Sequence, residues 1–370
     1  MLVADLAAPH YSWSRGRWFL NMILMKLLMR RCRATLRVSG LLWLGLTAFL
    51  AFAEAPPPIA GGFTLAVLPD TQNYAEKFPA TYEAQTRWIA DNVQRYRIAY
   101  VLHVGDVTQK NLDSEWQVAK RAHALLDGRV PYVLLPGNHD LGGEGAPKSR
   151  QTLLSDSFPV SAFRKWPTFG GVYDKEPDRL ENSFHRFTAG GRQWLVLALE
   201  FGPRNDVVRW ANDVVKQHPD RSVILVTHAY LRPDNRRFDR NATVIVKKAA
   251  KSAGLDNFGQ AKSPEGFNDG EDLWQKLVSQ HANFVLVVCG HSCVTARLDS
   301  QGKAGNTVHQ MMVDYQNQAN GGDGYLRLLQ FHPDGRKVTV RDYSPTLDRL
   351  SEIPGANYEF DVSPAPKGKQ

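Results

Sequence analysis

Cysteine is scarce in this sequence, with three residues among 370. Cys32 lies in the N-terminal 53 residues, which leaves Cys289 and Cys293 in the rest of the chain. A disulfide-rich scaffold is therefore excluded. One bond between the last two cysteines stays open, because their spacing across a predicted strand end makes its geometry uncertain. Hydrophobic residues make up 43% and charged residues 22%, as in a globular protein held by a core.

An excess of positive charge is also lacking once the N-terminus is set aside. The whole chain has 45 basic and 37 acidic residues. Residues 1–53 contain seven of the basic residues and one of the acidic ones, which leaves 38 against 36 and a net charge of +2. This balance gives no basis for nucleic-acid binding. We predict neither a nucleic-acid partner nor a stable protein partner.

The N-terminal apolar run is short for a membrane span. Residues 41–53 fall below the about 20 apolar residues that a transmembrane helix needs. Four arginines precede this run, and Ala51-Phe52-Ala53 has the small-x-small pattern of a cleavage site. These features are typical of a signal peptide, so we expect export to the periplasm or the medium. The alternatives are a true start at Met25 or Met29, and an uncleaved segment that anchors the protein to a membrane.

Apolar strand-like runs alternate with helical patterns after a linker at residues 54–62. Strands are expected over Phe63–Leu68, Tyr100–Val104, Val130–Leu135, Asn182–Thr188, Arg192–Leu199, Ser222–Val226, Asn283–Val288, Val308–Val313, Tyr325–His332 and Lys337–Tyr343. Helices are expected over Thr81–Arg97, Ser114–Leu126, Val207–Gln217 and Gly270–Gln280. The alternation predicts parallel units, and the last three strands are read as antiparallel. The predicted fold is a layered α/β sandwich with mixed sheets, one domain over 63–345 with a tail at 346–370.

Polar side chains follow five of the apolar runs. They are Asp70 and Gln72, Asp106, then Asn138, His139 and Asp140, then His228, and lastly His291 and Cys293. Ligands of open α/β sheets bind at the carboxyl ends of the strands. Carboxylate, amide and imidazole donors suit divalent Mn, Fe, Zn or Mg, and two such ions can share one carboxylate. The alternative, that these residues only cap turns, is disfavoured because all five runs end in this way.

The ordered motifs resemble those of the calcineurin-like metallophosphoesterases over roughly Phe63 to Tyr343. The family pattern D-x-H, GD, GNH[DE], H and GHxH is matched by Asp70, Gly105-Asp106, Gly137-Asn138-His139-Asp140, His228 and Gly290-His291. The resemblance implies a two-layered β-sandwich flanked by helices. It also implies a centre of two divalent metal ions at the edge of that sandwich.

The resemblance assigns a role to each matching residue. Asp106 would bridge the two metals, while Asn138, His228 and His291 complete one site and Asp70 serves the other. His139 would bind no metal and would stabilise the phosphoryl group or protonate the leaving oxygen. The implied activity is in-line attack of a metal-bound hydroxide on a small-molecule or envelope phosphoester. Monoesters and diesters both remain open as substrates.

Two departures from the family pattern fall on the Asp70 metal site. Gln72 stands where the family usually has histidine, as in a D-x-Q variant branch, and Cys293 replaces the last histidine. The Gln72 amide oxygen and the Cys293 thiolate are candidate ligands, although a disulfide would remove the thiolate. One alternative is therefore a non-catalytic or single-metal binding module. Another is a cell-surface protein that acts on envelope polymers.

Four other features are candidates with a plainer alternative. Asn73 and Tyr74 could line the pocket, because they follow the first ligand closely. The polar loop at 314–324 is either a close approach to a ligand or a hairpin connection. The segment Arg232–Asp269 is long, polar and rich in basic residues, so it is either a flap that attracts anionic substrate or a solvated loop. Histidines within strand patterns, such as His103, are expected to be satisfied core residues.

Overall fold

The computed structural model describes residues 55–142, 145–246 and 249–366. Every described residue belongs to one compact unit, which begins after Leu50. The predicted leader, its alternative start sites and Cys32 lie outside the described residues. Over the described ranges, no helix combines the length and the apolar character that crossing a bilayer requires.

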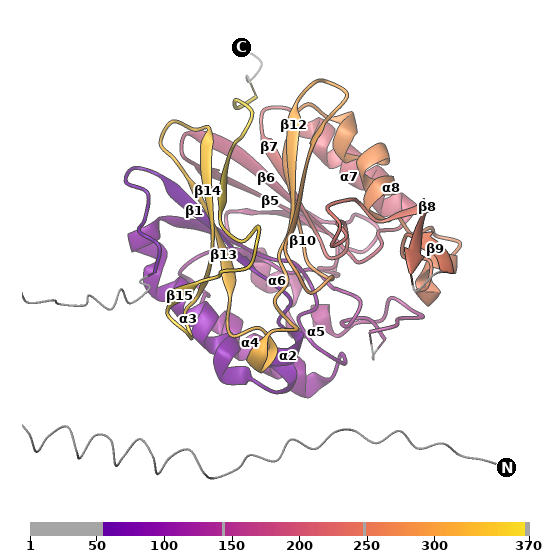
Figure 1. Cartoon of the computed structure of the whole chain (residues 1–370), viewed down its shortest axis with the longest axis horizontal. Helices are drawn as coiled ribbons and strands as arrows, with labels where there is room; N and C mark the ends of the chain where they lie inside the picture. The colour runs from indigo at the N-terminus through magenta and orange to yellow at the C-terminus, as the bar shows by residue number, and fades with distance from the viewer. Residues whose placement is uncertain (1–54, 143–144, 247–248, 367–370) are drawn as a thin grey trace, which may run out of the picture. The chain divides into compact units, whose positions relative to one another are not determined.

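Two seven-stranded mixed sheets form the centre of the fold (Figure 1). The first runs in the order β15 (Arg349–Leu350), β14 (Lys337–Ser344), β13 (Leu326–Phe331), β1 (Phe63–Leu68), β2 (Ile98–His103) and β3 (Tyr132–Val133), with β16 (Tyr358–Asp361) also paired to β14. The second runs in the order β11 (Ala296–Gln301), β12 (Thr307–Met312), β10 (Phe284–Cys289), β7 (Ser222–Thr227), β6 (Arg192–Leu199), β5 (Ser183–Ala189) and β4 (Phe169–Val172). Strands β1–β2–β3 are parallel, as are β6–β7–β10–β12, which confirms the predicted α/β class with mixed sheets.

Helices cover the outer faces of both sheets. The helices are α2 (Gln72–Glu76), α3 (Pro79–Tyr96), α4 (Asp113–Ala124), α5 (Leu154–Ser157), α6 (Val160–Phe163), α7 (Asn205–Gln217) and α8 (Gly270–Lys276), with short 3₁₀ turns η1 (Gly259–Lys262), η2 (Val278–Gln280) and η3 (Ala319–Gly321). One apolar cluster fills the space between the sheets. A second joins the first sheet to α3 and α4, and a third joins the second sheet to α7 and α8. The fold is therefore a β-sandwich between helical layers.

Strand β1 shows why the central strands read as continuous apolar runs. Its successive side chains point to opposite faces, with Leu65 and Val67 in the cluster between the sheets and Ala66 and Leu68 in the cluster under the helices. A strand buried on both faces has no polar face to alternate with. The strand ends at Leu68, and Asp70 follows two residues later at the edge of the sheet.

The predicted antiparallel arrangement of the last strands is wrong for residues 308–313. Strand β12 lies in the second sheet, parallel to β10 and antiparallel to β11. The sequence concealed this because β11 (ARLDSQ) is an edge strand with one buried side chain, Ala296. Because β11 was not predicted, nothing in the sequence indicated that β12 runs parallel to β10. Strands β13 and β14 are antiparallel, as predicted.

The segments predicted as linker and tail pack against the first sheet. Strands β15 and β16 pair with β14, and Val362 lies in the cluster between the sheets. Before β1, the Pro56 carbonyl accepts from the Tyr96 hydroxyl at 2.8 Å. The ordered fold thus extends beyond residues 63–345 at both ends.

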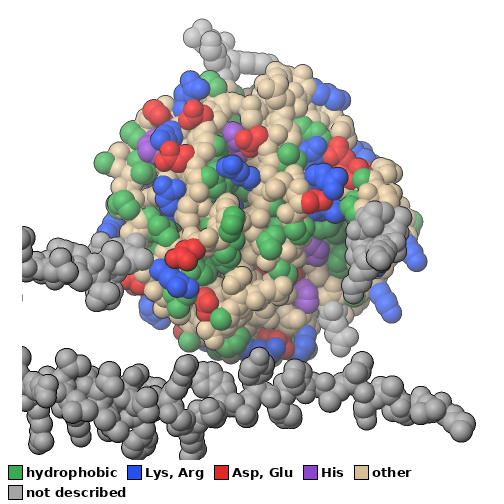
Figure 2. Space-filling view, viewed as in Figure 1, with side chains coloured by type: hydrophobic (Ala, Val, Ile, Leu, Met, Phe, Trp, Pro, Cys, Tyr) green, Lys and Arg blue, Asp and Glu red, His purple; other side chains and the backbone are tan. Residues whose placement is uncertain are grey.

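The polar segment after β7 contains a two-stranded hairpin, β8 (Asp239–Val246) and β9 (Ala249–Ala253). Arg237 and Arg240 form ion pairs with Glu271 and Asp272 at 2.6 and 3.3 Å. These guanidinium groups are therefore balanced by acids, which disfavours a freely basic flap. On the face shown in Figure 2, basic and acidic side chains are interspersed in the same way.

Candidate active site

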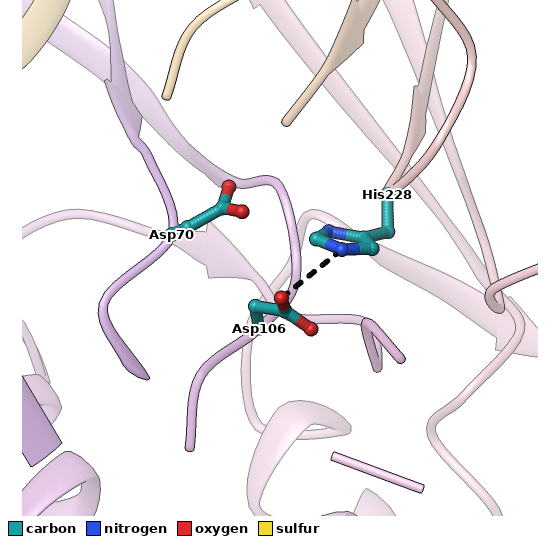
Figure 3. Close-up of side chains that lie close together, drawn as sticks. All are labelled: Asp70, Asp106 and His228. Carbon is teal, nitrogen blue, oxygen red and sulfur yellow. Dashed lines mark ion pairs between the residues drawn. The ribbon is translucent and has the colours of Figure 1, made fainter. Parts of the chain in front are cut away.

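The predicted ligands converge at the carboxyl ends of the parallel strands. Asp70 follows β1, Asp106 follows β2 and His228 follows β7, and all three side chains are buried. Each offers a ligand atom, and these atoms lie within 4.8 Å of one another. Figure 3 shows the three side chains pointing toward one another from different strands. Sequence-distant segments therefore build one polar centre inside an otherwise apolar edge.

Backbone turns in the left-handed region aim these side chains inward. Asp106 has φ 49° and His291 has φ 83°, values that L-residues adopt rarely. Gly105 before Asp106 has φ 93°, and a Cβ there would lie 2.9 Å from the Gly137 nitrogen. A Cβ on Gly290 would lie 2.0 Å from Asp70 Oδ1. The glycines of the GD and GH motifs are thus required by close approach.

Four donor atoms meet at one point beside Asp106. His228 Nε2 lies 3.0 Å from Asn138 Oδ1 and 3.2 Å from Asp106 Oδ2. His291 Nδ1 lies 2.8 Å from Asn138 Oδ1 and 3.1 Å from His228 Nε2. His228 Nδ1 faces the Val104 carbonyl at 3.0 Å and must donate to it, which directs the Nε2 lone pair into the centre.

This cluster fits a divalent cation. Ligands of a metal bound at about 2.0–2.2 Å lie about 3 Å from one another, and the four separations given above are of this size. Burial alone would lower the pKa of His228, but the adjacent Asp106 carboxylate raises it above its ordinary value. The carboxylate and the imidazole therefore favour a positive charge between them. A metal ion satisfies the same demand without a proton.

Asp70 adds a further carboxylate beside Asp106. One of its oxygens lies within 4.8 Å of ligand atoms of Asp106 and His228. Asp70 Oδ1 and Gln72 Oε1 are buried and have no hydrogen-bond partner among the described residues. Burial, with the charges of Asp314 and Asp106, raises the pKa of Asp70 well above its ordinary value. Buried oxygens without donors are costly unless a cation meets them, so Asp70 suits a divalent ion next to Asp106, and Gln72 stays a predicted ligand.

Cys293 is occupied by protein contacts. Its Sγ accepts a hydrogen bond from Gln316 Nε2 at 3.1 Å, and its backbone nitrogen donates to Asp314 Oδ2. Burial and the Asp314 charge raise the pKa of the thiol to about 11, so it is neutral. Cys289 and Cys293 are both free, so the disulfide left open by the sequence does not form. As a neutral thiol, Cys293 is a weak metal ligand.

His139 lies next to the bridging carboxylate without entering the cluster. Its backbone nitrogen donates to Asp106 Oδ1 at 2.9 Å, and its Nδ1 faces the Gln109 carbonyl at 2.8 Å. A carbonyl oxygen only accepts, so Nδ1 carries a proton and Nε2 is left for chemistry. A Cβ on Gly145 would lie 2.4 Å from this Nε2, so glycine there leaves the ring its space.

The two residues predicted to line the pocket make contacts within the fold. Tyr74 is buried in the core under the helices, and its hydroxyl accepts from the Gly324 nitrogen at 3.0 Å. A substrate contact of Tyr74 stays a prediction. Asn73 donates to the Gln316 carbonyl at 2.9 Å and so ties α2 to the polar loop after β12.

Two groups shape the centre in ways that the sequence does not predict. Asp140 accepts from the backbone nitrogens of Val107, Thr108 and Gly137, which locks the GD and GNHD loops together. Aromatic rings surround His291, with Phe201, Phe238 and Phe258 at 5.7–5.8 Å between ring centroids. The available signal was the presence of Phe238, Phe258 and Phe267 in a segment that otherwise reads as polar.

Comparisons with known proteins agree with this geometry. Residues 63–295 match the calcineurin-like phosphoesterase family. An uncharacterized Bacillus subtilis protein, YvnB, is 32% identical over 297 residues, which is 78% of this chain and 20% of that protein. This chain thus spans about a fifth of that relative's length.

Two solved structures are similar to this chain at low sequence identity. A dimetal phosphatase from Danio rerio is 11% identical, with 81% of this chain and 99% of that chain covered at a TM-score of 0.48. A purple acid phosphatase from yellow lupin seeds is 13% identical, with 84% and 55% covered at the same TM-score. Together with the family match over most of the domain, the ordered ligand set leads to one identification. The chain belongs to the calcineurin-like phosphoesterase family, whose members are metal-dependent phosphoester hydrolases.

Proposed function

We propose that this chain is an exported hydrolase of phosphoesters that works with two divalent metal ions. The observation that carries the proposal is the set of buried ligand groups around Asp106. Asn138, His228 and His291 lie together beside it, and an Asp70 oxygen lies within 4.8 Å of ligand atoms of Asp106 and His228. Asp70 Oδ1 is buried there without a hydrogen-bond donor, and a buried carboxylate oxygen of this kind calls for a partner such as a cation.

The residues of this centre have different roles in the proposed reaction. Two divalent ions held there would lower the pKa of a bound water and polarise the phosphoryl oxygens. Asp106 ties the GNHD loop to His228, because its Oδ1 accepts from the His139 nitrogen while Oδ2 faces His228. His139 Nε2, when protonated, donates to the leaving oxygen, because Nδ1 is already committed to Gln109.

The first experiment measures metal content and turnover of the purified protein together. Two metals per chain, with hydrolysis of para-nitrophenyl phosphate or its bis-ester in Mn²⁺, are the expected result. The preferred ester would separate a phosphatase from a phosphodiesterase. Absence of turnover with Mn²⁺, Fe²⁺, Zn²⁺ and Mg²⁺ would overturn the proposal.

Two variants separate metal binding from proton transfer. Asp106→Ala is expected to lose both metal and activity, because it removes the shared ligand. His139→Ala is expected to keep two metals and to lose about 10²–10⁴-fold in rate, the range for a general acid. Retained activity in Asp106→Ala would contradict a centre of two metals.

A single-metal binding module is the second candidate, and the contacts of Cys293 favour it. The thiol is neutral and engaged by Gln316, so the Asp70 cluster lacks the imidazoles usual in the family. This candidate predicts one metal per chain, at Asn138, His228 and His291, and no turnover. Metal stoichiometry therefore decides between the two functions.

Export is supported by the sequence of residues 1–53 alone. The arginines, the short apolar run and Ala51-Phe52-Ala53 favour cleavage after residue 53. N-terminal sequencing of the protein from medium, periplasm and membrane fractions tests this proposal. A chain that starts near residue 54 outside the membrane is expected, whereas an intact N-terminus in the membrane fraction would indicate an anchored envelope enzyme.

A further inference from the structure

His103 ends β2, three residues before Asp106, and it is fully buried. Its Nδ1 accepts a hydrogen bond from the Gly105 nitrogen at 3.2 Å. A backbone N–H only donates, so Nδ1 carries no proton. A neutral imidazole must then carry its proton on Nε2, and this contact fixes the tautomer of the ring.

The Nε2–H of His103 faces a hydroxyl from the neighbouring strand end. Thr71 Oγ1 lies 3.0 Å from His103 Nε2 and 3.2 Å from the Val107 carbonyl. The threonine hydroxyl can donate only to the carbonyl, so it accepts from His103. The Thr71 nitrogen also donates to the Asp106 carbonyl at 3.0 Å. One imidazole ring therefore joins the loop that carries Asp70 to the loop that carries Asp106.

The loop that carries Asp106 needs such a link because its backbone is strained. Asp106 is a non-glycine residue in the left-handed region, with φ 49°. Conformations of this kind persist only where surrounding contacts determine them. Asp70 directly precedes Thr71, so a shift of the threonine would carry its carboxylate away from Asp106.

We propose that His103 is a positioning residue that sets the separation of the Asp70 and Asp106 carboxylates through Thr71 and Gly105. As a statement about metal affinity, this inference rests on the proposed function. As a statement about the two loops, it rests on the hydrogen bonds alone. It assigns a role in the centre to a histidine that the sequence presents as an ordinary core residue.

Three variants test the role of the ring. His103→Leu fills the space but offers no acceptor to the Gly105 nitrogen. His103→Asn restores an acceptor, because an asparagine side chain bonds the nitrogen two residues on in an Asx-turn. His123→Phe is the matched control, since His123 is equally buried and bonds the Tyr82 hydroxyl at 3.0 Å. That hydroxyl also lies 3.2 Å from His103 Nε2, so the control removes a neighbour of the His103 ring and leaves the bonds of His103 to the two loops in place.

The measurements are Mn²⁺ titration calorimetry on the metal-free chain and amide hydrogen exchange read by mass spectrometry. His103→Leu is expected to bind Mn²⁺ about 10–100-fold more weakly, the usual effect of losing an outer support of a metal ligand. Peptides over residues 69–73 and 104–108 should exchange faster in this variant. His103→Asn should recover most of the affinity and the protection, and His123→Phe should change neither.

Either half of the inference can fail by itself. Equal Mn²⁺ affinity and equal exchange in His103→Leu and the unchanged chain would overturn the positioning role. The positioning role would also be overturned if His123→Phe lost Mn²⁺ affinity and loop protection to the same extent as His103→Leu. If the unchanged chain takes up no metal, the proposed function fails, and exchange in the two loops then decides alone whether His103 positions them.

Discussion

At the scale of single residues, the absence of a side chain at Gly145 allows the position of the His139 ring. A Cβ at this position would meet the His139 ring at 2.4 Å, and the Gly145 carbonyl accepts from Asn138 Nδ2. Gly145→Ala is expected to lower kcat about 10²-fold, because a displacement of about 1 Å has that effect on a catalytic group. Gly142→Ala is the control, since Gly142 also has positive φ but meets only Ser149 at 3.5 Å. Equal kcat in the two variants, with two metals bound in each, would contradict this use of His139.

A second residue-scale prediction concerns the departures from the family pattern. Gln72→His with Cys293→His would add two imidazole donors to the cluster that now has oxygens and a neutral thiol. We expect tighter Zn²⁺ binding at that site, because imidazole suits zinc better than an amide oxygen does. Zinc titration checks this, with Cys289→Ala as a control on a thiol that the core buries. Unchanged zinc affinity would mean that positions 72 and 293 do not face the metal.

The ligand residues could be predicted from the sequence because they share one local signal. Asp70, Asp106, Asn138, His228 and His291 each follow an apolar run, and strand ends meet at one edge. The residues that support these ligands cannot be assigned in this way. Asp140 follows an apolar run too, but it bonds nitrogens about 30 residues away, and His103 is one polar residue in an apolar strand. Their roles depend on which loops the fold brings together.

At the scale of elements, the segment after β7 provides an aromatic wall for the metal centre. Phe258 packs on Phe201 and His291 at 4.9 and 5.8 Å between ring centroids. Phe258→Ala is expected to cost about 3–5 kcal/mol of stability and to weaken metal binding at His291. Phe163→Ala is the control, because Phe163 is similarly buried in the core under the helices. Calorimetry should show weaker metal binding in the first variant only, and a loss in both would assign the effect to general destabilisation.

Elements were predictable where burial is two-sided and were missed at sheet edges. The central strands β1, β6, β7 and β10 lie where apolar runs predict them. The edge strand β11 and the hairpin β8–β9 are rich in polar residues, so their pairing is set by backbone contacts that composition does not reveal. The course of β12 was mispredicted for the same reason, since it depends on β11.

At the scale of the whole molecule, a buried ion pair joins the two sheets. Arg327 on β13 binds Asp342 on β14 at 2.7 and 2.8 Å and donates to the Met312 carbonyl of the other sheet at 3.2 Å. Arg327→Met is expected to lower the free energy of unfolding by about 3–5 kcal/mol, because it leaves a buried carboxylate unpaired. Adding Asp342→Leu should restore much of that loss. Urea unfolding at fixed metal concentration checks both values, and a single variant as stable as the unchanged chain would contradict the role of the pair.

The pairing of β16 with β14 has a consequence for how this protein can be shortened. The family match ends at residue 295, and the motifs end at His291 and Cys293. A chain cut after residue 345 would nevertheless strip β16 from Lys337–Val340 and remove Val362 from the core. The uncovered backbone groups of β14 would then offer a template for another chain, which is how open sheet edges start aggregation. Insolubility of such a fragment would thus indicate the loss of β16 from the edge of the sheet, and not that residues 63–345 are unable to fold.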